Sequence, residues 1–380
     1  MKPVRIAFIG QRGVPATIGG IEHHVEEIGS RLAARGHEVT VYTRGNYGGT
    51  RVREHRGMRV RYVPTAPTKH LEALVHSGLS TVAAMLPSQH SAHILHYHAI
   101  GPSVFTPLPR LLSNRRVVLT VHGLDYDRDK WGPGARTALR TAGWISAHVP
   151  HATITVSANL ADYYRQRYGR EAHHIRNGVT APVVRAPRLI TERWGLRGGD
   201  YVLFVGRLVP EKAPELLMAG FRGVDTSTRL VVAGGSSFTD DYVRTLESAA
   251  ALDSRILMAG SVYGELLQEL YSNAAAFVLP SKLEGLPLTL LEAASYRIPL
   301  IASDIPPHRE VIGQDGPGGR LFSSGDAAAL QDTLSSVLGS LAGEREGARE
   351  VGDRVVREYD WDEATDATED VYARLLADAR

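Results

Sequence analysis

Two glutamates eight positions apart, Glu284 and Glu292, have the types and spacing best suited to chemistry in this sequence. The apolar run 274–279 before them predicts a short buried strand, and Pro287 suits the first turn of a helix. Glu284 would then lie in a loop above the strand's carboxyl end, with Glu292 about a turn and a half into the helix. Such a loop offers free N–H groups and a positive dipole end to an anion. The pattern therefore predicts carboxylates that accept sugar hydroxyls beside a bound phosphate, and the alternative is two surface glutamates on an amphipathic helix.

Two cations five positions apart follow another predicted strand. The strand 201–206 ends in Gly206, and Arg207 and Lys212 come after it. A departing diphosphate needs positive charge, which Arg and Lys supply without a metal ion. We expect both side chains at solvent-lined positions, and the alternative is that they are solvated and bind nothing.

These segments resemble the E-x7-E signature and the Gly-Arg…Lys segment of retaining glycosyltransferases with the two-domain GT-B fold, the large family 4. The resemblance implies that Glu284 contacts the donor sugar, that Glu292 holds the nucleotide ribose, and that Arg207 and Lys212 stabilise the leaving diphosphate. It also implies retention of the anomeric configuration by same-face attack, because no motif supplies a double-displacement nucleophile. Further donor contacts are implied for Gly19, Gly20, Gly206, Gly260, Val262, Gly285, Leu286, Pro287 and Leu288.

A histidine in the first half also follows a predicted strand. His122 comes directly after the strand 116–121, at the kind of strand end where doubly wound sheets bind ligands. Together with the segment 98–102, it resembles a rhamnosyltransferase-like branch of family 4. This implies that His122 contacts the donor sugar or the acceptor, and it favours a deoxythymidine-diphosphate-linked deoxysugar while UDP and GDP sugars stay open. A lone histidine is more often structural.

Two patterns in the first half argue against cofactors. The segment Gly10 to Gly20 departs from G-x-G-x-x-G, which disfavours a nicotinamide or flavin dinucleotide. Its glycines before the predicted helix could let the backbone approach a ligand, and the alternative is a plain tight loop. Asp125-Tyr126-Asp127 looks like a metal-binding D-x-D, but Arg128 and Lys130 neutralise it, and the GT-B family does not use that motif. We therefore expect no metal and no cofactor besides the donor substrate.

Strand-like runs alternate with helix-period segments along all 380 residues, which predicts an α/β protein with two doubly wound parallel sheets. The turn-rich stretch 177–187 predicts a linker. We expect an acceptor-side, Rossmann-like domain over 1–183 and a nucleotide-sugar-binding, Rossmann-like domain over 184–360. The GT-B resemblance implies that they face each other across a cleft and that a helix over 361–380 crosses back to the first domain. The predicted strands are 4–10, 37–43, 58–63, 93–97, 116–121, 152–156, 201–206, 228–233, 255–259, 274–279 and 299–302.

Charge is unevenly distributed although the formal net charge is only +2. Residues 1–190 hold 25 Lys and Arg against 11 Asp and Glu, or +14, and the remainder has 18 against 30, or −12. The densest basic cluster is Arg51, Arg53, Arg56, Arg59 and Arg61. Such a half could contact an anionic membrane or acceptor. A solvated face produced by an Arg-rich codon bias is the equal alternative.

The absence of cysteine excludes disulfides, and neither a signal peptide nor a bilayer-spanning run is evident. We expect a cytoplasmic protein, with peripheral contact to the inner face of the membrane as an option, that acts on a saccharide, lipid-linked or small-molecule acceptor and binds no nucleic acid. The rival hypotheses are a non-hydrolysing nucleotide-sugar epimerase and a non-catalytic protein that binds nucleotide sugars.

Overall fold

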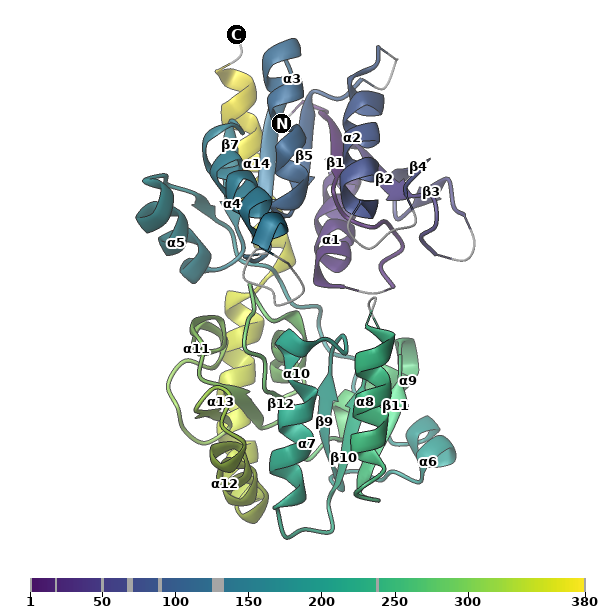
Figure 1. Ribbon diagram of the computed structural model, residues 1–380, viewed down its shortest axis with the longest axis vertical. Coiled ribbons are helices and arrows are strands. Elements are labelled where there is room, and N and C mark those ends of the chain that lie inside the picture. Colours follow the sequence, from purple (N-terminus) through teal and green to yellow (C-terminus); the bar gives the residue numbers. More distant parts are fainter. Residues whose placement is uncertain are drawn as a thin grey trace. The chain divides into compact units, whose positions relative to one another are not determined.

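The computed structural model describes residues 2–17, 19–48, 51–66, 71–87, 91–124, 133–236 and 239–378. The chain divides into two compact units (Figure 1). Unit 1 comprises residues 1–178 and 360–380, and unit 2 comprises residues 179–359. The division thus falls five residues before the boundary at 183/184 that we expected, still inside the turn-rich stretch.

Unit 1 is built on a sheet whose described strands run in the order β3-β4-β2-β1-β5-β6-β7-β8. All neighbours are parallel except β3 and β4. The chain moves outward from β1 in one direction and then returns to start again at β5. The carboxyl ends of β1 and β5 therefore form a topological switch point, where open α/β sheets bind ligands. The strands are β1 Arg5–Ile9, β2 Glu38–Arg44, β3 Glu54–His55, β4 Met58–Val63, β5 Ile94–His98, β6 Arg116–Val121, β7 Ala152–Thr155 and β8 His173–His174.

The helices of unit 1 come from both parts of the chain. They are α1 Gly20–Ala34, α2 Glu72–Met85, the 3-10 helix Gly101–Phe105, α3 Pro107–Leu112, α4 Pro133–His148, α5 Ala158–Tyr168 and α14 Trp361–Ala377. Helix α14 packs against α1 (Figure 1). Its first residue, Trp361, is buried against Gly178, where an added Cβ would lie 2.3 Å from the Trp361 backbone nitrogen. The residues after 360 therefore complete the core of unit 1.

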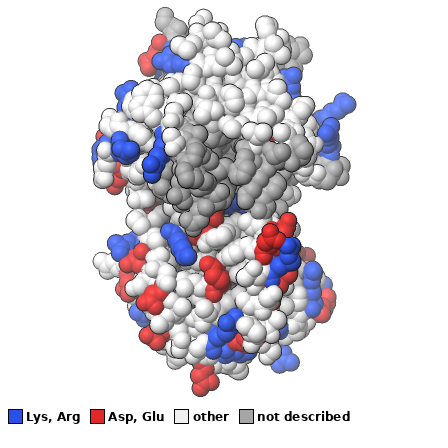
Figure 2. Space-filling view, viewed as in Figure 1, with Lys and Arg blue, Asp and Glu red and all other residues white. Residues whose placement is uncertain are grey.

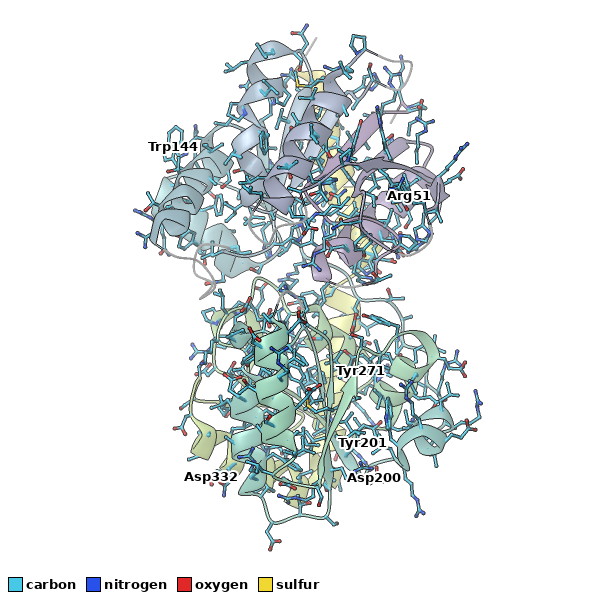
Figure 3. All side chains as sticks on the ribbon, turned by 45° about the vertical axis from the view of Figure 1, so that its right-hand side comes forward. Arg51, Trp144, Asp200, Tyr201, Tyr271 and Asp332 are labelled. Carbon is cyan, nitrogen blue, oxygen red and sulfur yellow. The ribbon has the colours of Figure 1, made fainter. Side chains whose placement is uncertain are left out.

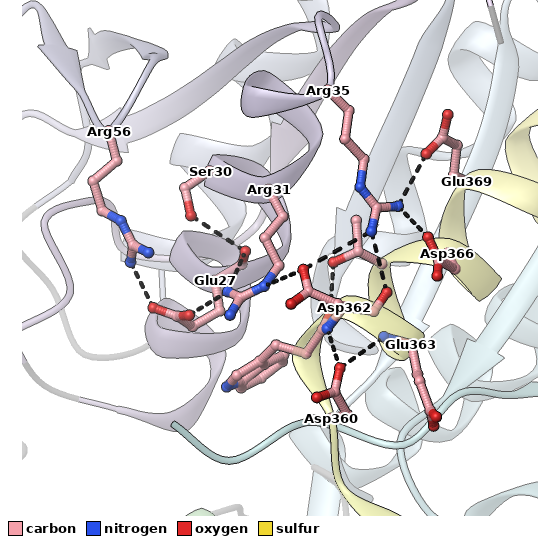
Figure 4. A network of polar contacts seen from close by, with 12 residues as sticks. Glu27, Ser30, Arg31, Arg35, Arg56, Asp360, Asp362, Glu363, Asp366 and Glu369 are labelled. Carbon is pink, nitrogen blue, oxygen red and sulfur yellow. Dashed lines mark hydrogen bonds and ion pairs between the residues drawn. The ribbon is translucent and has the colours of Figure 1, made fainter. Parts of the chain in front are cut away.

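Ion pairs join α14 to α1 (Figure 4). Arg31 Nε donates to Asp362 Oδ1 at 3.1 Å, and Arg35 pairs with Asp366 and with Glu369. This acidic helix offsets much of the basic first half. Unit 1 as folded carries 25 Lys and Arg against 18 Asp and Glu, or +7, and unit 2 carries 18 against 23, or −5. The split of +14 and −12 along the sequence is thus reduced by about half in the folded units.

Some arginines of the basic cluster at β3 and β4 make contacts within unit 1. Arg56 pairs with Glu27, as Figure 4 shows, and also with Glu26. Arg51, labelled in Figure 3, lies over the ring of Tyr62 at 5.1 Å. It also lines a hollow at the ends of β2 and β4. Several of the arginines expected to act together on an anionic surface therefore have partners in their own unit.

Unit 2 repeats the same strand order. Its sheet is entirely parallel and runs β11-β10-β9-β12-β13-β14. The switch point lies between β9 and β12. The strands are β9 Tyr201–Val205, β10 Arg229–Ala233, β11 Ile256–Gly260, β12 Ala276–Leu279, β13 Leu300–Ser303 and β14 Gly319–Phe322. The helices are α6 Leu189–Trp194, the 3-10 helix Pro210–Lys212, α7 Pro214–Arg222, α8 Asp240–Ala250, α9 Gly264–Asn273, α10 Leu288–Ser295, α11 Pro306–Ile312, α12 Ala327–Gly339 and α13 Leu341–Glu358.

The two sheets confirm the fold class that the sequence predicted, and every predicted strand is present with small shifts at its ends. The strands β3, β8 and β14 were not predicted. No helix in the described part of the chain combines the length and the apolar character that crossing a bilayer requires.

Candidate active site

The switch point of unit 2 brings together two of the predicted catalytic residues. Lys212 ends the 3-10 helix that follows β9, and Glu284 lies in the loop between β12 and α10. The Lys212 ammonium donates to Glu284 Oε1 at 2.5 Å. Their side chains are only 13% and 9% exposed, so Lys212 is not at the solvent-lined position that we expected. The two residues form a shielded ion pair because the two loops are also joined through the Lys282 N–H and the Glu211 carbonyl, at 2.9 Å.

Glu284 is held in its ionised form by its neighbours. Burial alone would raise its pKa, but the charge of Lys212 outweighs burial and lowers the pKa below its ordinary value. His308, on α11, is fully buried, and burial lowers its pKa to about 4. The ring is therefore neutral at pH 7, and its Nδ1–H can donate to the Ser303 carbonyl at 2.8 Å. Its Nε2 is buried and has no hydrogen-bond partner among the described residues. Sequence analysis missed His308, which lies beyond the predicted strand 299–302.

Glu292 is positioned by an aromatic pair. The Tyr271 hydroxyl, from α9, donates to Glu292 Oε2 at 3.0 Å. Burial, together with the Glu292 charge, raises the pKa of Tyr271 well above its usual value, so the phenol remains a donor. The Tyr271 ring, labelled in Figure 3, stacks on Tyr296 with centroids 5.3 Å apart. After α10 the chain makes a tight turn at Arg297, which has φ of 58°.

Helix α10 begins one residue later than we expected. Pro287 has an extended conformation and caps the helix, whose first residue is Leu288, so Pro287 is not part of the first turn. Gly285, Leu286 and Pro287 are buried in the loop before it. The helix still points its amino end toward the side of the sheet where Glu284 lies, which favours an anion there.

Glycines let the strand ends of unit 2 approach one another closely. The Gly206 N–H donates to the Ala233 carbonyl at 3.0 Å, and the Gly234 N–H donates to the Gly260 carbonyl at 2.8 Å. A Cβ on Gly234 would lie 1.9 Å from the Gly206 carbonyl oxygen. The half-buried Arg207 and the buried Val262 follow these strand ends. The loops after β9, β10 and β11 are therefore held side by side.

Three histidines gather at the carboxyl edge of the sheet in unit 1. His24 comes from α1, His98 ends β5, and His122 follows β6, and one ring nitrogen of each lies within 4.8 Å of the others. His98 Nδ1 is 3.2 Å from His122 Nε2, and His24 Nδ1 is 2.7 Å from Asn177 Oδ1. His122 thus lies where the sequence predicted. The roles of His24 and Asn177 were missed because they depend on contacts across 153 residues.

These imidazoles are uncharged at pH 7. Burial lowers the pKa of His24 to about 4, despite its bond to Asn177, and lowers the pKa values of His98 and His122 well below the usual range. His96, on β5, stacks on His98 at 4.5 Å and lies 2.6 Å from the Tyr372 hydroxyl of α14. The cluster is therefore supported from behind by α14.

Neutral imidazoles can exchange hydrogen bonds with substrate hydroxyls, and they are also metal ligands. His24, His98 and His122 are the group in the described part of the chain that could hold a metal ion. His98 Nδ1 and His122 Nε2 already lie within hydrogen-bonding distance of each other, so an ion that bound through these two nitrogens would have to replace that contact. The possible D-x-D pattern at Asp125 and Asp127 lies outside the described residues.

The glycine-rich loop of unit 1 closes on the first turns of α1. Gly19 caps the helix with φ of 104°, and a Cβ there would lie 2.2 Å from Glu22 Oε2. Glu22 Oε1 accepts the Arg12 N–H at 2.9 Å, and Glu26 accepts the Ala16 N–H at 2.5 Å. Gly19 is therefore needed for the conformation of this loop, because a side chain would collide with Glu22. The donor contacts of Gly19 and Gly20 stay a prediction.

Comparisons with known proteins agree with this architecture. Residues 18–181 match the domain family described as Glycosyltransferase Family 4, and residues 191–347 match Glycosyl transferases group 1. The chain is 28% identical to a glycogen synthase of Mycobacterium tuberculosis, over 97% of this chain and 94% of that protein. It is 26% identical to a GDP-mannose-dependent alpha-(1-6)-phosphatidylinositol monomannoside mannosyltransferase of Mycolicibacterium smegmatis, over 85% and 87%. A sucrose-phosphate synthase from Thermosynechococcus elongatus shares the fold, with a TM-score of 0.85, 22% identity, and coverage of 98% and 99%.

The two Rossmann-like units and the two matching domain families define a glycosyltransferase of the GT-B class. Within that class, the chain belongs to the group 1 and family 4 enzymes, and it is a nucleotide-sugar-dependent glycosyltransferase.

Proposed function

We propose that unit 2 binds the nucleotide-sugar donor at the β9–β12 switch point and that the sugar is transferred with its anomeric configuration retained. The observation that carries this proposal is the shielded Lys212–Glu284 pair, which places a cation and an ionised carboxylate beside the amino end of α10. A sugar diphosphate offers both partners that this pair needs: phosphate oxygens for the ammonium and hydroxyl groups for the carboxylate.

On binding, the donor would break the Lys212–Glu284 ion pair. Its phosphate oxygens would then contact Lys212, and its hydroxyl groups would contact Glu284. Lys212 and Arg207 would stabilise the negative charge that grows on the diphosphate, helped by the dipole of α10. Glu284 would accept sugar hydroxyls, and Glu292, oriented by Tyr271, would accept ribose hydroxyls. The Gly260–Val262 loop would contact the base through its backbone, and the segment Gly285 to Leu288 would contribute N–H groups.

Retention follows if the acceptor oxygen attacks from the face that the diphosphate leaves. The bond between the anomeric carbon and the phosphate oxygen breaks, and the bond to the acceptor oxygen forms. The acceptor proton passes to the departing phosphate. No protein nucleophile takes part in this sequence, and no metal is needed because the cations are supplied by the chain.

Unit 1 would supply the acceptor side. Its neutral histidines could orient hydroxyl groups without repelling a cation or attracting a phosphate. The acceptor class is proposed as a saccharide or a lipid-linked saccharide of polysaccharide biosynthesis, since one relative's name includes a phosphatidylinositol mannoside. The rhamnosyltransferase-like motifs at His98 and His122 favour a deoxythymidine diphosphate sugar, with GDP and UDP sugars as alternatives. The proposed location is the cytoplasm.

A thermal-shift panel of deoxythymidine, uridine, guanosine and adenosine diphosphates tests donor binding, because a ligand that binds the native state raises the melting temperature. We expect one diphosphate to stabilise the protein clearly more than the others, and to do so equally after treatment with EDTA. Loss of the shift on chelation would overturn the metal-free proposal. With the matching sugar nucleotide and an acceptor, the NMR coupling of the product's anomeric proton reports retention. Interconversion of the sugar without an acceptor would instead favour the epimerase.

A further inference from the structure

Helix α2 of unit 1 is amphipathic in the opposite sense to an ordinary surface helix. A surface helix normally turns its apolar stripe toward the core and its polar side toward water. The buried residues of α2 are mostly polar, while its exposed side is aliphatic. The buried residues are Glu72, His76, Ser77, Ser80, Thr81 and Ala84. The exposed residues on the helix and directly beside its ends are Leu71, Leu74, Val75, Leu79, Val82 and Leu86.

Two residues of the inward polar side, Glu72 and Thr81, have polar partners elsewhere in unit 1. Glu72 accepts from Arg44 at 2.6 Å and from Asn46 at 2.8 Å. Thr81 Oγ1 lies 2.9 Å from the Tyr97 hydroxyl of β5. A rotation of α2 that buried its leucines would break these bonds and leave buried polar groups without partners. The orientation of the helix is therefore fixed by its own contacts, and the apolar side must face outward.

The exposed residues of α2 form one stripe, since they recur at intervals of three and four positions. Helix α3 packs against α2 and adds Leu111 and Leu112, which are 79% and 69% exposed. We call the six exposed residues named above, together with Leu111 and Leu112, the α2–α3 face. In unit 2, the large exposed apolar side chains of the described residues are dispersed over separate elements. An apolar concentration of this kind marks an interaction surface.

The charges around the α2–α3 face are almost all positive. Between Leu71 and Arg115, the sequence contains one acidic residue, Glu72, which is buried and paired, against Arg110 and Arg115. Arg115 donates to the Met85 carbonyl at 2.9 Å and so lies at the carboxyl end of α2. Figure 2 shows the upper part of unit 1 as a broad uncharged area, with Lys and Arg and a few Asp and Glu toward its edges. An apolar surface with a cationic margin complements an anionic bilayer.

We propose that unit 1 docks on an anionic lipid surface through the α2–α3 face. The leucines and valines would enter the boundary between headgroups and acyl chains, and the arginines would contact lipid phosphates. A second copy of the chain fits less well, because a two-fold contact would bring the same arginines of both copies together. This docking is independent of which sugar is transferred, and it involves a different surface from the Arg51–Arg61 cluster.

Vesicle sedimentation tests the proposal with the full chain. We expect binding to vesicles that contain phosphatidylglycerol, weak binding to pure phosphatidylcholine, and only partial release by high salt because the apolar contacts persist. The double variant Leu79→Ser, Val82→Ser should lower the partition coefficient at least tenfold. The matched control is Leu252→Ser, Val356→Ser, which removes exposed apolar side chains of unit 2 and should bind like the unmodified protein.

Both pairs of positions are solvent-exposed, so the melting temperature should be unchanged in both variants. A third variant, Arg53→Ser, Arg59→Ser, separates the two candidate surfaces and should weaken binding much less than the α2 variant. The proposal is overturned if the unmodified protein ignores anionic vesicles or if the α2 variant binds as before. It is also overturned if sedimentation velocity shows a dimer that the α2 variant abolishes, which would make the face a contact between copies.

Discussion

The two units share one strand order but carry opposite chemistry at their switch points. In unit 2, the ends of β9 and β12 hold an ion pair, Lys212 and Glu284, in a shielded position. In unit 1, the edge that includes the end of β5 holds uncharged imidazoles. The histidines themselves are divided fifteen to one, with His308 the single histidine of unit 2. The comparison teaches that the shared topology provides a position for ligands, while the side chains at the strand ends decide whether charge or neutral hydrogen bonding is offered.

The two units should differ most in how their stability changes at low pH. The unfolded chain binds a proton on each histidine near pH 6.5, whereas folded His24 does so only near pH 4. Because the unfolded state then holds more protons, the free energy of unfolding of unit 1 falls as pH drops from 6.5 toward 4. His24 alone contributes about 3 kcal/mol to this loss, at about 1.4 kcal/mol per pKa unit. Hydrogen exchange at pH 7 and pH 5.5, resolved by unit, measures it.

Unit 2 is the internal control for this prediction, because only His308 has a similarly lowered pKa there. We expect protection in unit 2 to fall less than in unit 1. In the variant His308→Gln, the pH dependence of unit 2 should flatten further. Equal losses of protection in both units would contradict the assignment of acid sensitivity to the histidine cluster.

Removing Lys212 should have a large effect on both activity and stability. We expect Lys212→Ala to lower kcat by about a hundredfold or more, the scale for losing one positioned charge donor. It should also destabilise unit 2 by roughly 1–3 kcal/mol, because Glu284 is left shielded without its cation. Steady-state kinetics and chemical denaturation measure the two effects.

The double variant Lys212→Ala, Glu284→Gln separates the effect on stability from the effect on activity. It should recover part of the lost stability, since the unpaired charge is gone, but none of the activity. Full stability in the Lys212→Ala single variant would mean that the ion pair contributes little to the fold of unit 2.

The two glutamates should differ in what they bind. Glu292→Gln should weaken the affinity for the free nucleoside diphosphate by about tenfold, as expected for a lost charged hydrogen-bond acceptor. Glu284→Gln should leave that affinity nearly unchanged while it impairs sugar transfer. Tyr271→Phe is a milder test, because it leaves the Glu292 carboxylate in place but removes the donor that orients it. Calorimetry with the diphosphate alone decides, and equal losses at both glutamates would rule out the division of roles.

The smallest effect should come from the ion pairs between α1 and α14. Arg35 is 27% exposed and its partner Asp366 is 69% exposed, so solvent screens much of their attraction. We expect Arg35→Gln to destabilise unit 1 by about 1 kcal/mol or less, and by less still at high salt. The matched change in unit 2, Arg297→Gln, removes an exposed pair with Asp353 and should have an even smaller effect on melting.

The sequence predicted the sheets well because buried parallel strands are short apolar runs between turn residues, as in 201–206 and 116–121. It missed β14, Gly319–Phe322, where glycine and arginine interrupt the apolar pattern, and β3 and β8, which are two residues long. It also could not predict the orientation of α2. There, the polar residues face inward because Arg44 and Tyr97 offer them partners, and periodicity alone assigns such residues to the solvent side.

The candidate site was predicted residue by residue but not as an arrangement. Lys212 and Glu284 were both identified, yet their pairing joins positions 72 residues apart and depends on how two loops meet. The supporting residues Tyr271 and His308 carry no local signal, since an aromatic residue on a helix and a histidine after a strand usually serve packing. The aromatic and histidine partners of a site therefore had to be found in the folded chain.

The position of α14 in unit 1 has a consequence for how the protein is made. Unit 1 needs residues from before and after unit 2, so a ribosome must synthesise all of unit 2 before Trp361 can cover Gly178. We therefore expect unit 2 to be able to fold as a continuous segment, whereas nascent unit 1 waits with its histidine cluster uncovered. Arrested chains that end before residue 360 should leave unit 1 open to protease and unit 2 protected, once it has emerged. Chaperones that bind nascent chains would therefore contact the first-synthesised part of unit 1. That part is also the last to reach its native packing.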